Sequence, residues 1–164
     1  LRKGACAVDF AELAKEEFIF PSVEFEDNVG VIRFLASKLI DEGVVKADFA
    51  DAVVEREKGF PTGLQVGEIN VAIPHTDAKY VNAAGMAVAT LKRHVNFGKM
   101  DEPEKKIPVH VVFLLAVLDP QGYIKFLSKL ARKFGDASFM SSIYNASTAK
   151  EIARILKENL SEPE

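Results

Sequence analysis

Apolar residues recur every three or four positions along several stretches of the chain, the spacing that places them on one face of a helix. This pattern predicts helices over residues 27–41 and 48–58, one that begins at Asp119 and Pro120, a short one over 136–144, and a last one that opens at Thr148. Asp48 is expected to be an N-cap, and Gly43 follows a predicted helix as a stop signal. Thr148 and Glu151 have the spacing of a capping box.

Shorter apolar stretches predict strands at residues 18–20, 70–74, 85–91 and 108–118. The first is expected to stop at Pro21, and the second leads through Pro74 directly into His75. The last, PVHVVFLLAVL, is almost continuously apolar, which predicts a central strand covered on both faces. Strands that alternate with helices predict an α/β domain, a sheet with helices packed against it.

Length and composition fit a single domain over residues 1–164, with residues 1–8 as a loose leader. The net charge is −3 and no block of basic residues is present, which argues against a nucleic-acid partner. The longest apolar run, Val111 to Leu118, is far too short to span a bilayer. Cys6 is the only cysteine, which fits a reducing compartment. We therefore expect a soluble cytoplasmic protein.

His75 is the first candidate for chemistry because it stands at the end of a short buried strand, between rigid Pro74 and polar Thr76 and Asp77. Side chains at strand ends are held by the scaffold and remain open to solvent. A neutral imidazole is a competent nucleophile near pH 7. Position alone leaves the alternative of a surface or structural histidine equally open.

The segment before His75 adds groups that suit a phosphoryl group. Arg56 stands near the end of a predicted helix, and its guanidinium offers a planar fork of donors for phosphate oxygens. Thr62 offers a hydroxyl, and Gly59 and Gly63 let backbone N–H groups approach an anion. The alternative for Arg56 is a solvated cation that is favourable at the helix end.

The other histidines carry weaker signals. His94 lies in a charged stretch and is expected on the surface, whereas His110 is near the start of the central strand. His110 is either a satisfied sheet histidine or, if the strands are neighbours, an accessory group beside His75, and Thr76 is a second accessory candidate. The spacing of the three histidines matches no compact metal motif, and no P-loop or G-x-S-x-G elbow occurs. We expect neither a metal nor a cofactor.

Several separated segments, in order, resemble the fructose–mannitol type of enzyme IIA of the sugar phosphotransferase system. They are Arg56-Glu57-Lys58, Pro61-Thr62-Gly63-Leu64, Ala72-Ile73-Pro74-His75, Val112-Phe113-Leu114-Leu115-Ala116-Val117 and Leu127-Ser128-Lys129-Leu130-Ala131. The resemblance extends from about Phe18 to Leu160. It implies an α/β fold with a mixed central sheet and helices on both sides.

The resemblance also implies a role. The histidine that matches His75 accepts a phosphoryl group on Nε2 from a histidine-containing phosphocarrier protein and passes it to a IIB domain, which phosphorylates the sugar during uptake. The arginine that matches Arg56 lies near the phosphohistidine. Such a protein is not inserted in the membrane and associates with the transporter through IIB and IIC.

One position departs from the family pattern. Many fructose and mannitol members have a second histidine just before the segment that matches Leu127-Ser128-Lys129-Leu130, and Tyr123 occupies that position here. The stretches Pro74-His75-Thr76-Asp77, Val95-Asn96-Phe97 with Met100, and Leu115 to Pro120 look most like galactitol-type proteins. A nitrogen-type regulatory module shares the histidine motif without transporting sugar, and a purely structural domain is the remaining alternative.

Overall fold

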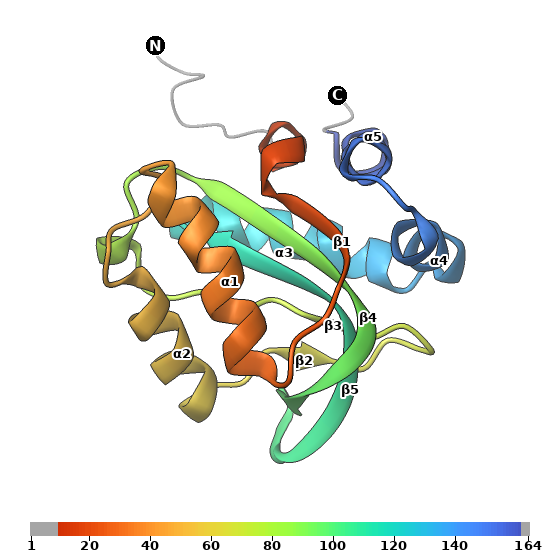
Figure 1. Ribbon diagram of the computed structural model, residues 1–164, viewed down its shortest axis with the longest axis horizontal. Coiled ribbons are helices and arrows are strands. Elements are labelled where there is room, and N and C mark those ends of the chain that lie inside the picture. The colour runs from red at the N-terminus through yellow and green to blue at the C-terminus, as the bar shows by residue number, and fades with distance from the viewer. Residues whose placement is uncertain (1–9, 162–164) are drawn as a thin grey trace.

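The computed structural model describes residues 10–161, whose strands form one mixed sheet (Figure 1). The main elements, in chain order, are β1 (Ile19–Val23), α1 (Asn28–Asp41), α2 (Phe49–Gly59), β2 (Gly63–Leu64), β3 (Val71–Ala72), β4 (Gly85–Lys99), β5 (Glu102–Ala116), α3 (Pro120–Phe134), α4 (Ala137–Asn145) and α5 (Ala149–Leu160). Short 3-10 helices occupy Phe10–Leu13, Glu16–Phe18 and Ala78–Tyr80. The predicted α/β class is confirmed.

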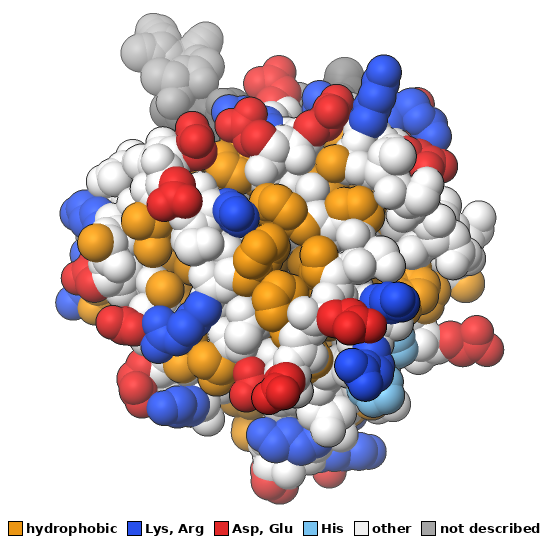
Figure 2. All heavy atoms as spheres, viewed as in Figure 1, with side chains coloured by type: hydrophobic (Ala, Val, Ile, Leu, Met, Phe, Trp, Pro, Cys, Tyr) orange, Lys and Arg blue, Asp and Glu red, His pale blue; other side chains and the backbone are white. Residues whose placement is uncertain are grey.

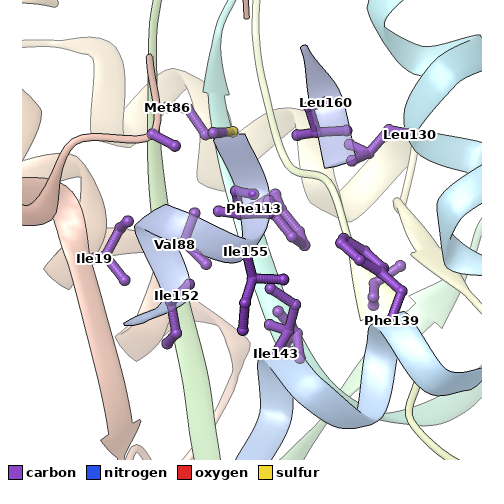
Figure 3. Packing of buried hydrophobic residues seen from close by; sticks show 14 of the residues in the cluster. Ile19, Met86, Val88, Phe113, Leu130, Phe139, Ile143, Ile152, Ile155 and Leu160 are labelled. Atoms are coloured by element: carbon purple, nitrogen blue, oxygen red, sulfur yellow. The ribbon is translucent and has the colours of Figure 1, made fainter. Parts of the chain in front are cut away.

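Helices cover both faces of the sheet because its inner strands are apolar on both sides. Val112 and Leu114 of β5 pack with α1 and α2, whereas Val111, Phe113 and Leu115 pack with α3, α4 and α5. Figure 3 shows Phe113 among side chains of α4 and α5 in the second of these cores. The prediction of a central strand covered on both faces is therefore confirmed.

The sheet contains both strand directions. β1 lies parallel to β4, β4 and β5 form an antiparallel hairpin, and β3 lies parallel to β5. β2 pairs antiparallel with β3 and meets the end of β4 at Gly63 and Lys99. Because β3 and β5 are parallel neighbours, the residues that follow both strands leave the sheet at the same edge. Leu115 N–H donates to the carbonyl of Pro74 at 3.0 Å, which fixes this edge just before His75.

An aromatic cluster joins β1 to α1 on the face of the sheet that α1 and α2 cover. The rings of Phe20 and Phe25 both meet that of Phe34, at centroid distances of 4.9 and 5.2 Å, and Lys38 Nζ lies 5.0 Å from the Phe34 centroid. Figure 2 shows apolar side chains gathered in the middle of this face and charged ones around them. These contacts pack α1 against β1.

The first strand was predicted to stop at Pro21, but in the structure it continues to Val23. Among the described strands β1 pairs only with β4, and an edge strand tolerates a residue without an N–H. The backbone of Ser22 has φ +55°, and its N–H donates to the Thr90 hydroxyl at 2.7 Å instead of to a ladder carbonyl. The strand therefore passes the proline through a local irregularity.

Strands β4 and β5 are longer than the predicted strands 85–91 and 108–118, and the strand before His75 is shorter than predicted. β4 extends to Lys99 and β5 begins at Glu102. The sequence did not predict these added residues because they are largely polar and exposed and therefore lack an apolar run. β3 covers only Val71–Ala72 of the predicted 70–74. The two-residue strand β2 was not predicted.

Most of the predicted helix signals are confirmed. Asp119 accepts a hydrogen bond from Gln121 N–H, with Pro120 at the first helical position, and Thr148 accepts one from Glu151 N–H. Gly43 has φ +73°, the left-handed conformation that suits a residue after a helix. Asp48 is the N-cap residue of α2, as predicted, but its side chain makes no capping hydrogen bond.

Candidate active site

His75 lies just beyond β3, and its imidazole is held by the backbone of the preceding residues. Its side chain is half-buried, with Nδ1 2.9 Å from the carbonyl oxygen of Ile73. A carbonyl only accepts hydrogen bonds, so Nδ1 carries the proton in the neutral ring. The lone pair is then on Nε2, the nitrogen that can act as a nucleophile.

The surroundings of His75 favour the neutral imidazole. Burial lowers its pKa below the ordinary value, the hydrogen bond to Ile73 works in the opposite direction, and the positive charge of Arg56 lowers it further. Each cause acts on the relative stability of the charged form. The ring is therefore unprotonated on Nε2 around neutral pH.

Tyr123 reaches His75 from the first turn of α3. Its hydroxyl oxygen lies 3.3 Å from Nδ1 and 3.4 Å from Nε2, and the ring centroids are 5.0 Å apart. Burial raises the pKa of Tyr123 to about 12. The sequence identified Tyr123 only as the residue in place of a second histidine; the contact arises because β3 and β5 are parallel and both lead to this edge.

Arg56 is close enough to act on both rings. It is exposed near the C-terminal end of α2, and its guanidinium carbon lies 5.3 Å from the centroid of the Phe60 ring. Its charge contributes to lowering the pKa of His75 and opposes the rise at Tyr123. Within residues 10–161 it forms no ion pair with a carboxylate, so its donors are available to an anion. It is a helix-end cation whose charge acts on His75 and Tyr123.

Thr62 has a structural role that the sequence did not reveal. It is buried, its N–H donates to Glu57 Oε2 at 2.7 Å, and its hydroxyl donates to Glu57 Oε1 at 2.9 Å. The hydroxyl proton expected for a phosphoryl oxygen is thus used inside the fold. Gly63 also serves packing, because a Cβ there would be 2.6 Å from the carbonyl oxygen of Gly98.

Glu57 is the site neighbour that sequence reasoning missed. It follows Arg56 and is buried, and this burial raises its pKa from the ordinary 4.5 to about 7, against the bonds from Thr62 and the charges of Arg56 and Lys106. Glu57 and Thr62 together tie the end of α2 to the chain that leads into β2. The only sequence signal was a carboxylate five residues before a threonine, which is too common to be diagnostic.

The buried carboxyl predicts a pH-dependent stability. The pKa of the Glu57 carboxyl is 4.5 in the unfolded chain and about 7 in the folded protein. The stabilising contribution is therefore complete below 4.5, declines as the pH rises and is lost above about 7. The difference is about 3 kcal/mol in the free energy of unfolding.

Glu57→Gln should remove this decline in stability because an amide does not ionise. The amide can still accept a hydrogen bond from the Thr62 N–H and donate one to the Thr62 hydroxyl. Urea unfolding of both proteins across this pH range measures how the free energy of unfolding changes with pH. Glu55→Gln, at an exposed position, is the control and should show the wild-type change with pH. If the free energy of unfolding changed equally with pH in wild type and Glu57→Gln, Glu57 would ionise in the fold as it does in the unfolded chain.

The structure separates His110 from His75. The two strands are neighbours, as the accessory role required, but β3 Val71 lies opposite Val111, so His110 is level with Asn70 at the other end. His110 Nδ1 accepts from Asn70 N–H at 3.1 Å, as a satisfied sheet histidine does. His94 is exposed, as predicted. Thr76 is buried next to His75 in the chain, and its accessory role stays a prediction.

The chain is similar to known proteins of one family. The family model described as "Phosphoenolpyruvate-dependent sugar phosphotransferase system, EIIA 2" matches residues 12–159. The chain belongs to this family. As an EIIA chain it is a phosphoryl-transfer component of a sugar phosphotransferase system. None of the helices in its described part is both long and apolar enough to cross a membrane.

The relatives of this EIIA chain include transport and regulatory proteins. The galactitol-specific EIIA component of Escherichia coli K12 is 25% identical over 126 residues, which cover 77% of this chain and 83% of that protein. The nitrogen regulatory protein IIA-Ntr of Neisseria meningitidis is 30% identical, with a TM-score of 0.72 over 90% of this chain and 98% of that one. Enzyme IIAMTL of E. coli, solved in complex with phosphorylated enzyme IIBMTL, shares the fold at a TM-score of 0.73 and 21% identity, over 88% and 96% of the chains.

Proposed function

We propose that His75 Nε2 is the phosphoryl acceptor of this EIIA chain. The observation that carries the proposal is the hydrogen bond from Nδ1–H to the Ile73 carbonyl, which leaves the Nε2 lone pair free at a partly exposed strand end. Burial and Arg56, which lower the pKa of His75, support the same role because only the neutral ring is nucleophilic.

The transfer needs no proton movement. The Nε2 lone pair forms the new N–P bond while the N–P bond of a donor phosphohistidine breaks, and that electron pair returns to the donor ring. The product ring of His75 carries Nδ1–H and the phosphoryl group, so it gains positive charge. The Ile73 carbonyl that accepts from Nδ1–H stabilises this charge.

Arg56 is the residue suited to the transferring group. A phosphoryl group between two nitrogens spreads negative charge over its oxygens, and catalysis consists largely of positioning and charge stabilisation. The charge of the guanidinium acts on His75, and in the described part of the chain the guanidinium has no carboxylate partner. Thr62 has no direct part in this proposal, since its hydroxyl is bonded to Glu57.

Exposed apolar side chains adjoin Arg56 in space and Tyr123 along the chain. Phe60, beside Arg56, is 67% exposed, and Ile124, next to Tyr123, is 64% exposed. Leu118, before α3, is also exposed. Small groups of exposed apolar side chains favour short-lived docking. We propose a histidine-containing phosphocarrier protein as the donor and a IIB domain as the acceptor, in the cytoplasm, with galactitol or a related polyol as the sugar. The similarity to the galactitol-specific component supports that sugar class.

A phosphotransfer assay tests the proposal. The chain is incubated with phosphoenolpyruvate, enzyme I and the phosphocarrier protein, and its intact mass is measured. We expect the gain of one acid-labile phosphate. No gain by the folded protein, with donors that are active on a known IIA protein, would rule out the carrier role.

A regulatory role is the second candidate, favoured by the 30% identity to IIA-Ntr. Both roles predict phosphorylation, so the onward step distinguishes them. In transport, the phosphorylated chain loses its phosphate to a IIB domain with an accessible acceptor; in regulation, it keeps the phosphate and its binding to another protein changes. Stable phosphohistidine in the presence of galactitol-type, mannitol-type and fructose-type IIB domains would favour the regulatory role.

A further inference from the structure

The Tyr123 hydroxyl lies in an unusual place relative to His75. It is almost equally far from the two ring nitrogens, at 3.3 and 3.4 Å. In the plane of the imidazole, a point at these distances would collide with the carbon between the nitrogens. The oxygen therefore lies out of the plane, over that edge of the ring, and the tilt of 47° between the two rings agrees with this.

This position leaves the nucleophile free. The Nε2 lone pair points outward in the ring plane, and the Nδ1 proton is directed to Ile73. The Tyr123 hydroxyl therefore has no well-directed acceptor in the imidazole, and its bond to the ring is weak. Its proton is available for a better acceptor that arrives on the same side.

Phosphorylation supplies that acceptor. The phosphorus would lie in the ring plane beyond Nε2, with three oxygens spread around the N–P axis, so that one oxygen faces the side covered by Tyr123. We propose that Tyr123 donates its hydroxyl proton to this phosphoryl oxygen, making a hydrogen bond present in the phosphorylated and transferring states and absent in the free protein. The inference rests on the proposed role of His75.

Two further observations support a donor here. The charge of Arg56 acts on Tyr123 as well as on His75, which favours an anionic group beside these two rings. Burial keeps the Tyr123 hydroxyl protonated, with a pKa of about 12, so it remains a donor through the physiological range. A histidine in this position would change its protonation near neutrality.

Tyr123→Phe tests the proposal because it keeps the ring and removes only the hydroxyl. The variant is mixed with phosphorylated phosphocarrier protein, and both the transfer rate and the equilibrium distribution of phosphate are measured by intact mass. We expect each to fall roughly 10-fold, the effect of one hydrogen bond to a charged group. The equilibrium is informative because a residue that only supports the fold does not shift it.

Tyr144→Phe is the matched control, since its hydroxyl donates to the Leu91 carbonyl at 2.7 Å, away from His75. It should transfer like wild type. A Tyr123→Phe variant with wild-type rate and equilibrium would overturn the inference while the carrier role stands. Failure of wild type itself to accept phosphate would overturn the carrier role, and the inference with it.

A measurement on the wild type avoids any effect of substitution on folding. The chain has three tyrosines, so carbon-13 labelling at the hydroxyl-bearing ring carbon gives three resonances. Phosphorylation should shift the Tyr123 resonance and leave those of Tyr80 and Tyr144 in place. An unmoved Tyr123 resonance in the phosphorylated protein would overturn the proposed bond.

Discussion

His75→Asn should take up no phosphate in an assay that gives the wild type one phosphate per chain. The asparagine amide can still donate to the Ile73 carbonyl, as Nδ1–H does at 2.9 Å, so the local backbone contact is preserved. What is lost is Nε2, the atom with the free lone pair. An amide is not a nucleophile near pH 7, so we expect complete loss of uptake and not a slower reaction.

The control separates this site from the other histidines. His94→Gln changes an exposed ring and should accept phosphate at the wild-type rate, and His110→Gln tests the ring that bonds Asn70 at the far end of β3. Intact mass before and after acid treatment identifies a phosphohistidine in each variant. Acid-labile phosphate on His75→Asn would place the acceptor elsewhere in the chain.

Much of the site could be predicted because it depends on local sequence. His75 directly follows a short apolar stretch and a proline, and these alone place it at a strand end. The central strand was visible because β5 is buried on both faces and therefore apolar at successive positions. Helix starts such as Asp119 were visible because a cap bonds only to its own first turn.

The parts that could not be predicted depend on register or on burial. Tyr123 meets His75 only because β3 and β5 are parallel neighbours, and the same register moves His110 away from it. The sequence shows that Tyr123 and His75 are present but does not show that they lie in contact. Thr62 was expected to face an anion, yet Glu57 takes its hydroxyl, and nothing in the sequence marks Glu57 as buried. Polar residues in a helix are usually solvated, so a buried carboxylate is missed by pattern.

Glu57 and Thr62 also explain how the exposed Arg56 is placed. The carboxylate that holds Thr62 follows Arg56 directly and fixes the last turn of α2 against the strand that starts at Gly63. Phe60 lies between them in the chain, and its ring lies against the guanidinium. The buried pair thus supports a cation whose own side chain remains exposed. This arrangement predicts that Arg56 matters for transfer much more than for stability.

Arg56→Ala should slow phosphoryl transfer by roughly 100-fold, the usual loss when one preorganised donor is removed. The variant should unfold within about 0.5 kcal/mol of wild type, because Arg56 is exposed. Its charge also contributes to lowering the pKa of His75, so its loss should raise that pKa. Since only neutral His75 reacts, the rate should then begin to fall at a higher pH as the solution is acidified.

Arg56→Lys tests whether charge alone is sufficient. Lysine keeps the positive charge but not the planar fork of donors, so the pH profile should stay near wild type while the rate lies between those of wild type and Arg56→Ala. Lys58→Ala is the control: Lys58 is an exposed cation on the same helix end, and it pairs with Glu55 at 3.8 Å. Single-turnover transfer from the phosphorylated phosphocarrier protein measures all four proteins. An Arg56→Ala variant as fast as Lys58→Ala would mean that Arg56 is only a solvated helix-end cation. The Tyr123 hydroxyl would then be the remaining side-chain donor proposed for the site.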